Sequence, residues 1–437
     1  MKGNAMRKIA IGAVIAALPG LAMAQDAVPA APAADTAYIF NTLLFLIGGF
    51  LVFWMAAGFA MLEAGLVRSK NVAMQLTKNV ALFSIAALMY WLIGYGIMYP
   101  GEWTVDGVIG ELAVKGIKGG ADAADGYSAG SDFFFQLMFC ATTASIVSGT
   151  LAERIKLWPF LIFTVVLTGV IYPMEASWEW GGGWVDGLGF SDFAGSTLVH
   201  AAGGAAALAG AIILGPRLGK YGKDGRVRPF LGSNLPLATL GTFILWMGWF
   251  GFNGASQLAM GTIEDADAIA QIFSNTNAAA AAGAVAALLL TQALYKKVDL
   301  TMVLNGALAG LVSITAEPLT PTLGEATLIG AIGGVIVVFA VPMLDKLKID
   351  DVVGAIPVHF LAGIWGTIIV AWTNDDVSFG PQIIGCFSII AFVFLVSAAV
   401  WMLLKATMGI RVTEEEEMAG LDQAELGMEA YPEFVKV

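Results

Sequence analysis

Residues 193–215 read FAGSTLVHAAGGAAALAGAIILG, and residues 352–374 read VVGAIPVHFLAGIWGTIIVAWTN. Each segment is long enough to cross a bilayer as a helix, and its single ionisable side chain is a histidine, His200 or His359. The chain has no other histidine. Because a titratable group at membrane depth is costly and tends to face an internal cavity or pathway, the pair marks a candidate functional site.

The composition indicates a membrane protein. Of the 437 residues, 58% are hydrophobic and 13% are charged, which is far more apolar than a soluble domain. The formal net charge of −12 argues against nucleic acid as a partner. We therefore expect an all-α membrane protein.

The first 24 residues have the features of a secretory signal peptide. Three basic residues precede an apolar run over 9–18, and Ala-Met-Ala at 22–24 forms a small-x-small cleavage site. An uncleaved first span is the alternative, but the run is short for a spanning helix. We expect cleavage after Ala24 and a periplasmic linker over 25–38.

Eleven further apolar segments are long enough to be spanning helices. They cover residues 39–66, 79–98, 133–152, 157–175, 193–215, 233–256, 269–295, 300–316, 326–344, 352–374 and 382–404. We expect an eleven-span domain over 39–407 and a cytoplasmic regulatory tail over 408–437, in which four consecutive glutamates at 414–417 indicate a solvated segment.

Lysine and arginine collect in alternate loops, which indicates the orientation because cytoplasmic loops are rich in positive charge. One set contains Arg68, Lys70, Lys78, Arg154, Lys156, Arg217, Lys220, Lys223, Arg226, Arg228, Lys296, Lys297, Lys346, Lys348, Lys405 and Arg411. The other set contains Lys115 and Lys118. The bias predicts a bacterial inner-membrane protein with its N-terminus outside and its C-terminus in the cytoplasm, as an odd number of spans requires.

The histidines fall in the fifth and tenth segments, which predicts two five-helix repeats plus one extra helix. Repeats with an odd number of spans have inverted topology, and their interface holds the site. The sequences Leu-Val-His-Ala-Ala-Gly at 198–203 and Pro-Val-His-Phe-Leu-Ala-Gly at 357–363 are faintly similar. With the boundaries above and a rise of about 1.5 Å per residue, the histidines lie roughly 10 Å apart in depth, so contact requires shifted boundaries.

The histidine pair has several alternative explanations. It could be a structural hydrogen bond between two helices. It could also ligate haem in a membrane cytochrome, with Gly203, Gly204 and Gly363 leaving space, although one haem needs far fewer than eleven spans. A zinc hydrolase is disfavoured because the chain lacks a His-Glu-x-x-His motif and a third histidine, and a retinal pump because no segment has a mid-span lysine. We expect no metal and no cofactor.

Several other strings resemble the ammonium transporter (Amt) family, in order along nearly the whole mature chain. They are EAGLVRSKN at 63–71, GTLAER at 149–154, WGGG at 180–183, DFAGSTLVH at 192–200 and GWFGFN at 248–253. The resemblance implies a homotrimer in membrane lipid with one pore per subunit, and ammonium or ammonia and methylammonium as substrates. It also implies a PII-type nitrogen signal protein as a partner of the tail.

Elementary chemistry supports that substrate. Ammonium and potassium are close in size, but an amine forced into an apolar space loses affinity for its proton, and potassium has none to lose. A pore with apolar walls and two imidazoles would pass ammonia and relay the proton separately, which makes transport electrogenic. Rings in contact would titrate as one pair.

The resemblance also assigns roles to aromatic and hydroxyl residues. Trp180 and Ser256, with Phe139, match the outer recruitment site, where a cation–π contact contributes roughly 0.5–2 kcal/mol. Phe139 and Phe252 match two stacked rings that close the pore, and Trp249 matches a pore-lining aromatic. Core packing is the alternative for each, because the chain has 26 phenylalanines and 12 tryptophans.

Three acidic positions and one departure from the family complete the site. Asp192 is expected to cap the fifth span and attract cations without touching them. Glu63 and Glu153, beside Arg68 and Arg154, indicate ordinary ion pairs. Many relatives have Asp-x-Phe-Gly-Val-His before the second histidine. Here Gly354 replaces the acid and Pro357 the glycine, so we expect a disturbed helix there.

Two other functions stay open. An ammonium sensor would bind without transporting, although the tail is too short for a signalling domain. A neutral ammonia channel of the related Rh type shares the implied fold, but the triple glycine and the GWFGFN string favour the Amt side.

Overall fold

The structure is a computed structural model that describes residues 34–117 and 126–434, so the predicted signal peptide and residues 25–33 of the linker lie outside it. The described residues form helices and isolated bridges, without strands. The α-helices are α1 (Ala34–Leu66), α2 (Val72–Met89), α3 (Tyr95–Met98), α4 (Ala129–Thr150), α5 (Leu157–Val166), α6 (Tyr172–Ser177), α7 (Ala202–Leu214), α8 (Leu235–Gly254), α9 (Ile263–Tyr295), α10 (Leu300–Ile314), α11 (Leu323–Lys346), α12 (Ala362–Thr373), α13 (Phe379–Thr407) and α14 (Glu414–Ala419).

Short 3-10 and π-helical segments join or extend these helices. The π-helical segments are η2 (Tyr90–Gly94), η4 (Leu167–Ile171), η6 (Ser196–Ala201), η8 (Ile356–Leu361) and η9 (Asp422–Leu426). The 3-10 segments are η1 (Ser69–Asn71), η5 (Asp186–Leu188), η7 (Ala255–Gln257) and η10 (Pro432–Phe434). Two of the π-helical segments, η6 and η8, carry the histidines.

Ten helical segments of the described residues are long and apolar enough to cross a membrane, and α10, with 15 residues, is a shorter apolar helix. Together they match the eleven predicted spans. Several boundaries differ from prediction. For example, α1 begins at Ala34, inside the predicted linker, and the second span begins at Ser69 and not at 79. The predicted boundary at 79 was late because polar side chains at the start of that span are buried against neighbouring helices.

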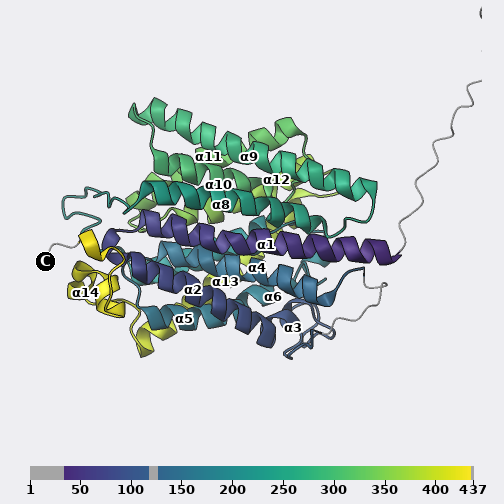
Figure 1. Cartoon of the computed structure of the whole chain (residues 1–437), viewed down its shortest axis with the longest axis horizontal. Coiled ribbons are helices and arrows are strands. Elements are labelled where there is room, and N and C mark those ends of the chain that lie inside the picture. The colour runs from purple at the N-terminus through teal and green to yellow at the C-terminus, as the bar shows by residue number, and fades with distance from the viewer. Residues whose placement is uncertain (1–33, 118–125, 435–437) are drawn as a thin grey trace, which may run out of the picture. The chain divides into compact units, whose positions relative to one another are not determined.

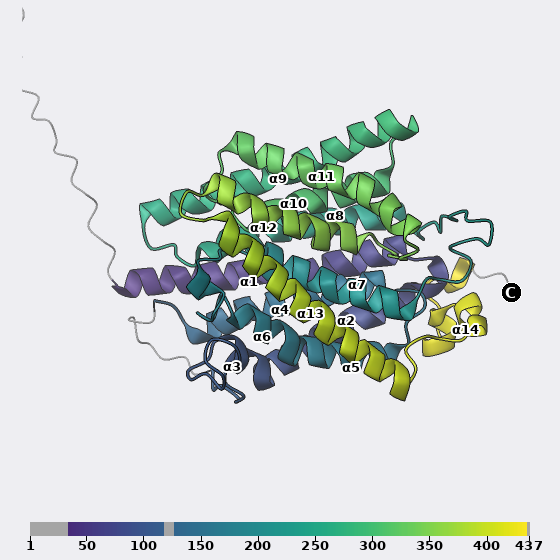
Figure 2. The same cartoon turned by 180° about the vertical axis from the view of Figure 1, so that it is seen from behind.

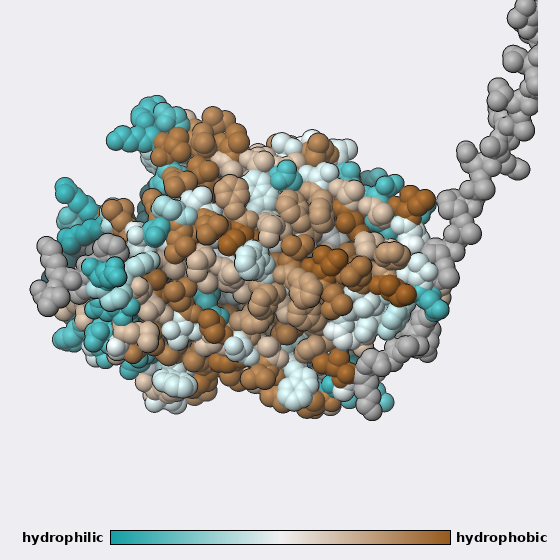
Figure 3. All heavy atoms as spheres, viewed as in Figure 1, coloured by the Kyte–Doolittle hydropathy of each residue, from teal (hydrophilic) through white to brown (hydrophobic). Residues whose placement is uncertain are grey.

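The outer surface of the helices is apolar. Large hydrophobic side chains such as Phe50 (62% exposed), Phe243 (62%) and Leu395 (64%) point outward. Figure 3 shows hydrophobic residues over the middle of the helices and hydrophilic residues gathered towards their ends. A surface of this extent indicates a lipid environment, because water would disfavour it.

The spans Ala129–Thr150 and Ser196–Leu214 are the most enclosed, with 89% and 83% of their most apolar window buried. α1 packs along α8, and α9, α10 and α11 pack closely together (Figures 1 and 2). Glycines permit the close approach of the latter three: a Cβ on Gly283 would lie 2.2 Å from the Gly306 carbonyl oxygen, and one on Gly334 would lie 2.2 Å from that of Gly283. Such small-residue contacts drive helix association in lipid.

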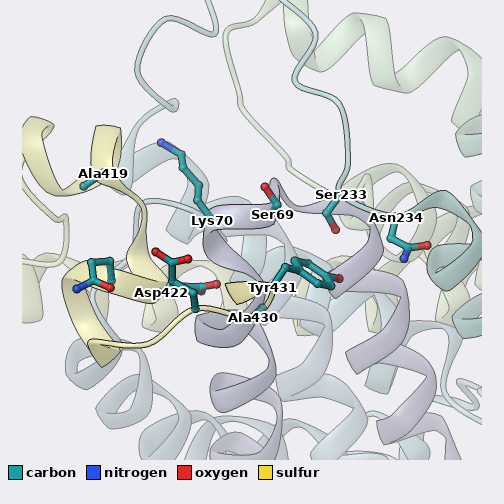
Figure 4. A pocket seen from close by; sticks show the side chains of 10 residues that line it. Ser69, Lys70, Ser233, Asn234, Ala419, Asp422, Ala430 and Tyr431 are labelled. Atoms are coloured by element: carbon teal, nitrogen blue, oxygen red, sulfur yellow. The ribbon is translucent and has the colours of Figure 1, made fainter. Parts of the chain in front are cut away.

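The tail docks on one end of the helices, which we call the tail side. Asp422 accepts hydrogen bonds from the backbone N–H groups of Ala73 (3.0 Å) and Met74 (2.7 Å) at the start of α2, and Glu425 accepts one from Leu157 N (3.1 Å) at the start of α5. Carboxylates are favourable at helix N-termini. The tail lines one side of an open pocket of about 450 Å³, and Lys70 and Ser233 lie on its other side (Figure 4). The tail is therefore held to the helices, whereas a solvated segment had been predicted.

Candidate functional site

The two histidines are in contact. His200 Nδ1 lies 3.1 Å from His359 Nδ1, and the ring centroids are 5.2 Å apart with planes inclined at 22°. Both side chains are buried, with 0% and 4% of the residue surface exposed. Nitrogens this close share a hydrogen. The spans begin at Ser196 and Ile356, later than the predicted 193 and 352, and each histidine lies in the first turns of its helix.

Asp192 determines where the first of these helices begins. Its carboxylate is fully buried and accepts hydrogen bonds from the four backbone N–H groups of residues 195–198, at 2.7 to 3.0 Å. Burial raises the pKa of Asp192 to about 6, and the four donors oppose that shift. Gly195 turns the chain with φ +103°, a conformation that favours glycine. Asp192 is placed as a cap, in the position expected from the sequence.

Asp351 caps the helix of the second histidine as Asp192 caps that of the first, and the sequence analysis did not identify it. It accepts hydrogen bonds from Gly354 N (3.2 Å) and Ile356 N (2.7 Å), and Gly354 turns the chain with φ +81°. Each aspartate is eight residues before its histidine and three before its left-handed glycine, a repeated spacing that was visible in the sequence. Asp351 therefore caps this helix three residues before Gly354.

Pro357 does not disturb the helix in the way expected. It occupies the first turn of η8, where a backbone N–H has no partner inside the helix. Proline is tolerated at that position, and His359, two residues later, still reaches His200.

A column of aromatic rings leads to the histidines. The edge of the Trp180 ring system meets Phe139, with centroids 5.9 Å apart at 87°, and Phe139 lies against Phe252 at 4.1 Å. Phe252 is 5.3 Å from His200. Trp249 stacks on His200 at 4.9 Å and 20°. The structure thus brings together the predicted recruitment, gate and pore-lining rings in one continuous series.

Hydrogen bonds fix the orientation of this series. Trp180 Nε1 donates to the carbonyl oxygen of Asp192 (3.0 Å), and Trp249 Nε1 donates to the hydroxyl of Thr315 (2.8 Å). The Ser256 hydroxyl donates to the carbonyl oxygen of Phe252, one turn earlier (2.8 Å). Because this hydroxyl donates its hydrogen to a carbonyl, its oxygen can accept a hydrogen bond from a cationic donor.

The two rings predicted to form the gate are in contact and buried. Phe139 is 1% exposed and Phe252 is fully buried. A charged ion that reaches them loses its hydration and gains no charged partner, at a cost that far exceeds that of a neutral molecule. The arrangement therefore favours passage of a neutral species.

The acidic residues on the tail side are arranged differently from the prediction. Glu153 pairs with Arg68 (2.5 Å) and Arg217 (3.3 Å), whereas Arg154 donates to backbone carbonyls. Glu63 forms no ion pair with the described residues, so the ion pair predicted for it is wrong. Its carboxylate faces amide and hydroxyl donors inside the membrane span.

The geometry does not suit haem ligation by the two facing nitrogens. Two nitrogens on opposite sides of an ion, each about 2 Å from it, are roughly 4 Å apart. The Nδ1 atoms are 3.1 Å apart, which is a hydrogen-bond distance.

The chain is similar to ammonium transporters over most of its length. The sequence model of the Ammonium Transporter Family matches residues 43–431. The ammonium transporter Amt2 of Archaeoglobus fulgidus is 42% identical, with 89% of this chain and 88% of that protein covered. A putative ammonium transporter of Synechocystis is 40% identical, with 98% and 97% covered.

Solved structures agree in fold. A sensor Amt protein is 35% identical, with a TM-score of 0.84 and coverage of 90% of this chain and 100% of that one. Mep2 of Candida albicans is 27% identical, with a TM-score of 0.80 and 92% of each chain covered.

Proposed function

This chain belongs to the ammonium transporter family, and we propose that it carries ammonium across a membrane by separating ammonia from a proton. The observation that carries the proposal is the buried contact between His200 and His359 at the end of a closed aromatic column. An apolar column alone would admit ammonia but would leave the proton behind. A hydrogen-bonded imidazole pair supplies a route for it.

In this mechanism ammonium binds beside Trp180 and Ser256 and loses its proton at the gate formed by Phe139 and Phe252. Ammonia then crosses the gate as a neutral molecule. The proton follows through the histidine pair, so that net movement carries charge. Asp192 acts by positioning: it caps the helix that presents His200, and its carbonyl holds the Trp180 indole.

The test is charge movement across proteoliposomes of the purified protein after an ammonium pulse, with potassium as the control. We expect a current with ammonium and none with potassium. A double variant in which both histidines are replaced by asparagine should lose the proton-linked current. An unchanged current in that variant would rule out the relay through His200 and His359.

Two other functions are distinguished by the same measurement. The similarity to a sensor Amt protein supports a sensor as the second candidate, and binding of ammonium without any transport would identify it. A change of internal pH without current would identify a neutral ammonia channel.

Assembly and location are further proposals. We infer a homotrimer in a bacterial inner membrane with the tail side in the cytoplasm, supported by the loop charges and the family. The mass of the detergent-solubilised protein tests the trimer, and N-terminal sequencing tests cleavage after Ala24. A PII-type protein is the partner we propose for the tail, and a binding assay with the full-length protein tests it.

A further inference from the structure

Glu63 is a buried acid close to the pore that the mechanism above does not use. It is 1% exposed and lies one helical turn after Phe59, whose ring centroid is 6.2 Å from that of His359. A buried carboxylate is costly unless donors or a counter-charge compensate it. The hydrogen-bond donors and charges around Glu63 therefore indicate its role.

Donors hold one oxygen of Glu63 and leave the other without a partner. Oε2 accepts hydrogen bonds from the amides of Gln75 and Asn79 (2.8 Å for Asn79) and from the hydroxyl of Ser148 (3.0 Å). Oε1 accepts none from the described residues, and it borders Gly149, where an added Cβ would lie 3.1 Å from it. The carboxylate is thus fixed in place with one oxygen available for a proton.

Lys78 provides the counter-charge without occupying that oxygen. It is 1% exposed inside the second span, although the sequence placed it in a loop. Its Nζ donates to the carbonyl oxygen of Ser148 (2.9 Å) and lies 4.7 Å from the centroid of Phe160. Ser148 therefore bonds both charges, and no described ion pair joins them directly.

A small cavity borders both Glu63 and His359. Of the residues that line it, only His359 and Glu63 titrate. Its volume of about 10 Å³ has room for about one water. Asn305, Val353 and Gly354 also line a larger cavity of about 570 Å³, whose wall includes Arg217 and Lys220. Glu63 and His359 thus border one small cavity, which shares part of its wall with a larger cavity lined by basic and acidic side chains.

We propose that Glu63 receives the proton from the histidine pair and returns it to ammonia at the tail-side end of the pore. The inference rests on the proposed function. An N–H bond of the imidazolium breaks, one water passes the proton on, and an O–H bond forms at Glu63 Oε1. Ammonia then takes that proton, which restores the carboxylate and forms ammonium. No other reactant is needed.

The experiment compares E63Q, E63D and the double variant E63Q/K78Q in proteoliposomes of the full-length protein. Two signals are recorded: the ammonium current, and the internal alkalinisation caused by ammonia entry. E63Q should lower the current about a hundredfold, the contribution of a positioned proton-transfer group. It should raise alkalinisation above that of wild type, because ammonia would then enter without its proton. E63D should retain part of the current.

The double variant controls for folding, because E63Q alone leaves Lys78 as an unpaired buried charge. E63Q/K78Q removes both charges and should lose the current as E63Q does. Wild-type current in either variant, while the double histidine variant has lost its current, overturns the role of Glu63 and leaves the histidine relay standing. Loss of current without a rise in alkalinisation also overturns it, because Glu63 would then only shape the pore.

Discussion

Replacing Gly354 by alanine is expected to destabilise the protein by roughly 2–5 kcal/mol. The left-handed conformation at φ +81° costs an alanine about 1–2 kcal/mol. The new Cβ would also lie 2.5 Å from Asn305 Nδ2. The amide must then move and lose its hydrogen bond to the Val353 carbonyl (3.0 Å), which costs a further 1–3 kcal/mol or so.

Gly225 provides the matched control. It has nearly the same backbone conformation, φ +77°, but nothing lies within 4 Å of an added Cβ, so G225A should cost only about 1–2 kcal/mol. Unfolding of each variant by SDS titration in one detergent gives the free energies. In an N305A background, the free-energy cost of G354A should fall to that of G225A, because the added Cβ no longer clashes with the Asn305 amide. Equal costs for G354A and G225A in the wild-type background would refute the reasoning.

Three further predictions use the same preparation. R217M should cost about 3–5 kcal/mol in the unfolding assay, because it leaves the buried carboxylate of Asp350 without an ion pair and leaves Glu153 with Arg68 alone. A loss below about 1 kcal/mol would contradict this. Burial disfavours the charged form of Asp350, but the hydrogen bonds and charge of Arg217, with the charge of Arg154, hold its pKa well below the usual value. Because its pKa is lower in the folded than in the unfolded state, ionised Asp350 stabilises the folded protein above the unfolded-state pKa, and this stabilisation is lost as the pH falls. The Tm of the wild type should therefore fall more steeply than that of D350N below about pH 4. D422A should cost about 0.5–2 kcal/mol and speed proteolysis of the tail, with E414Q, at an exposed position, as the unaffected control.

The spans and the histidine site could be predicted because lipid constrains each helix separately. A hydrophobic length and a loop charge are local properties, and a histidine in an apolar segment is conspicuous whatever surrounds it. The contact between the two histidine rings was harder to predict. It depends on where two helices begin, and buried hydrogen bonds to Asp192 and Asp351 determine those positions.

The environment of Glu63 could not be predicted from its own segment. Arg68 follows it closely in the sequence, and an ion pair was the simplest expectation. Its actual partners come from α2 and α4, which approach only after the helices pack. Lys78 was misplaced for the same reason, because a lysine before an apolar run has the pattern of a loop residue. Such errors concentrate where polar side chains are buried.

The two histidines meet through the same ring nitrogen. In the neutral pair one Nδ1 carries the shared hydrogen and the other is bare. Each neutral imidazole holds a single N–H, so the ring with the bare Nδ1 has its hydrogen on Nε2, and the other ring has a bare Nε2. One outer nitrogen therefore donates while the other accepts. When one proton passes from the accepting outer nitrogen to the donating one, the two outer nitrogens exchange these roles. Both rings must then change tautomer before a second proton can pass in the same direction.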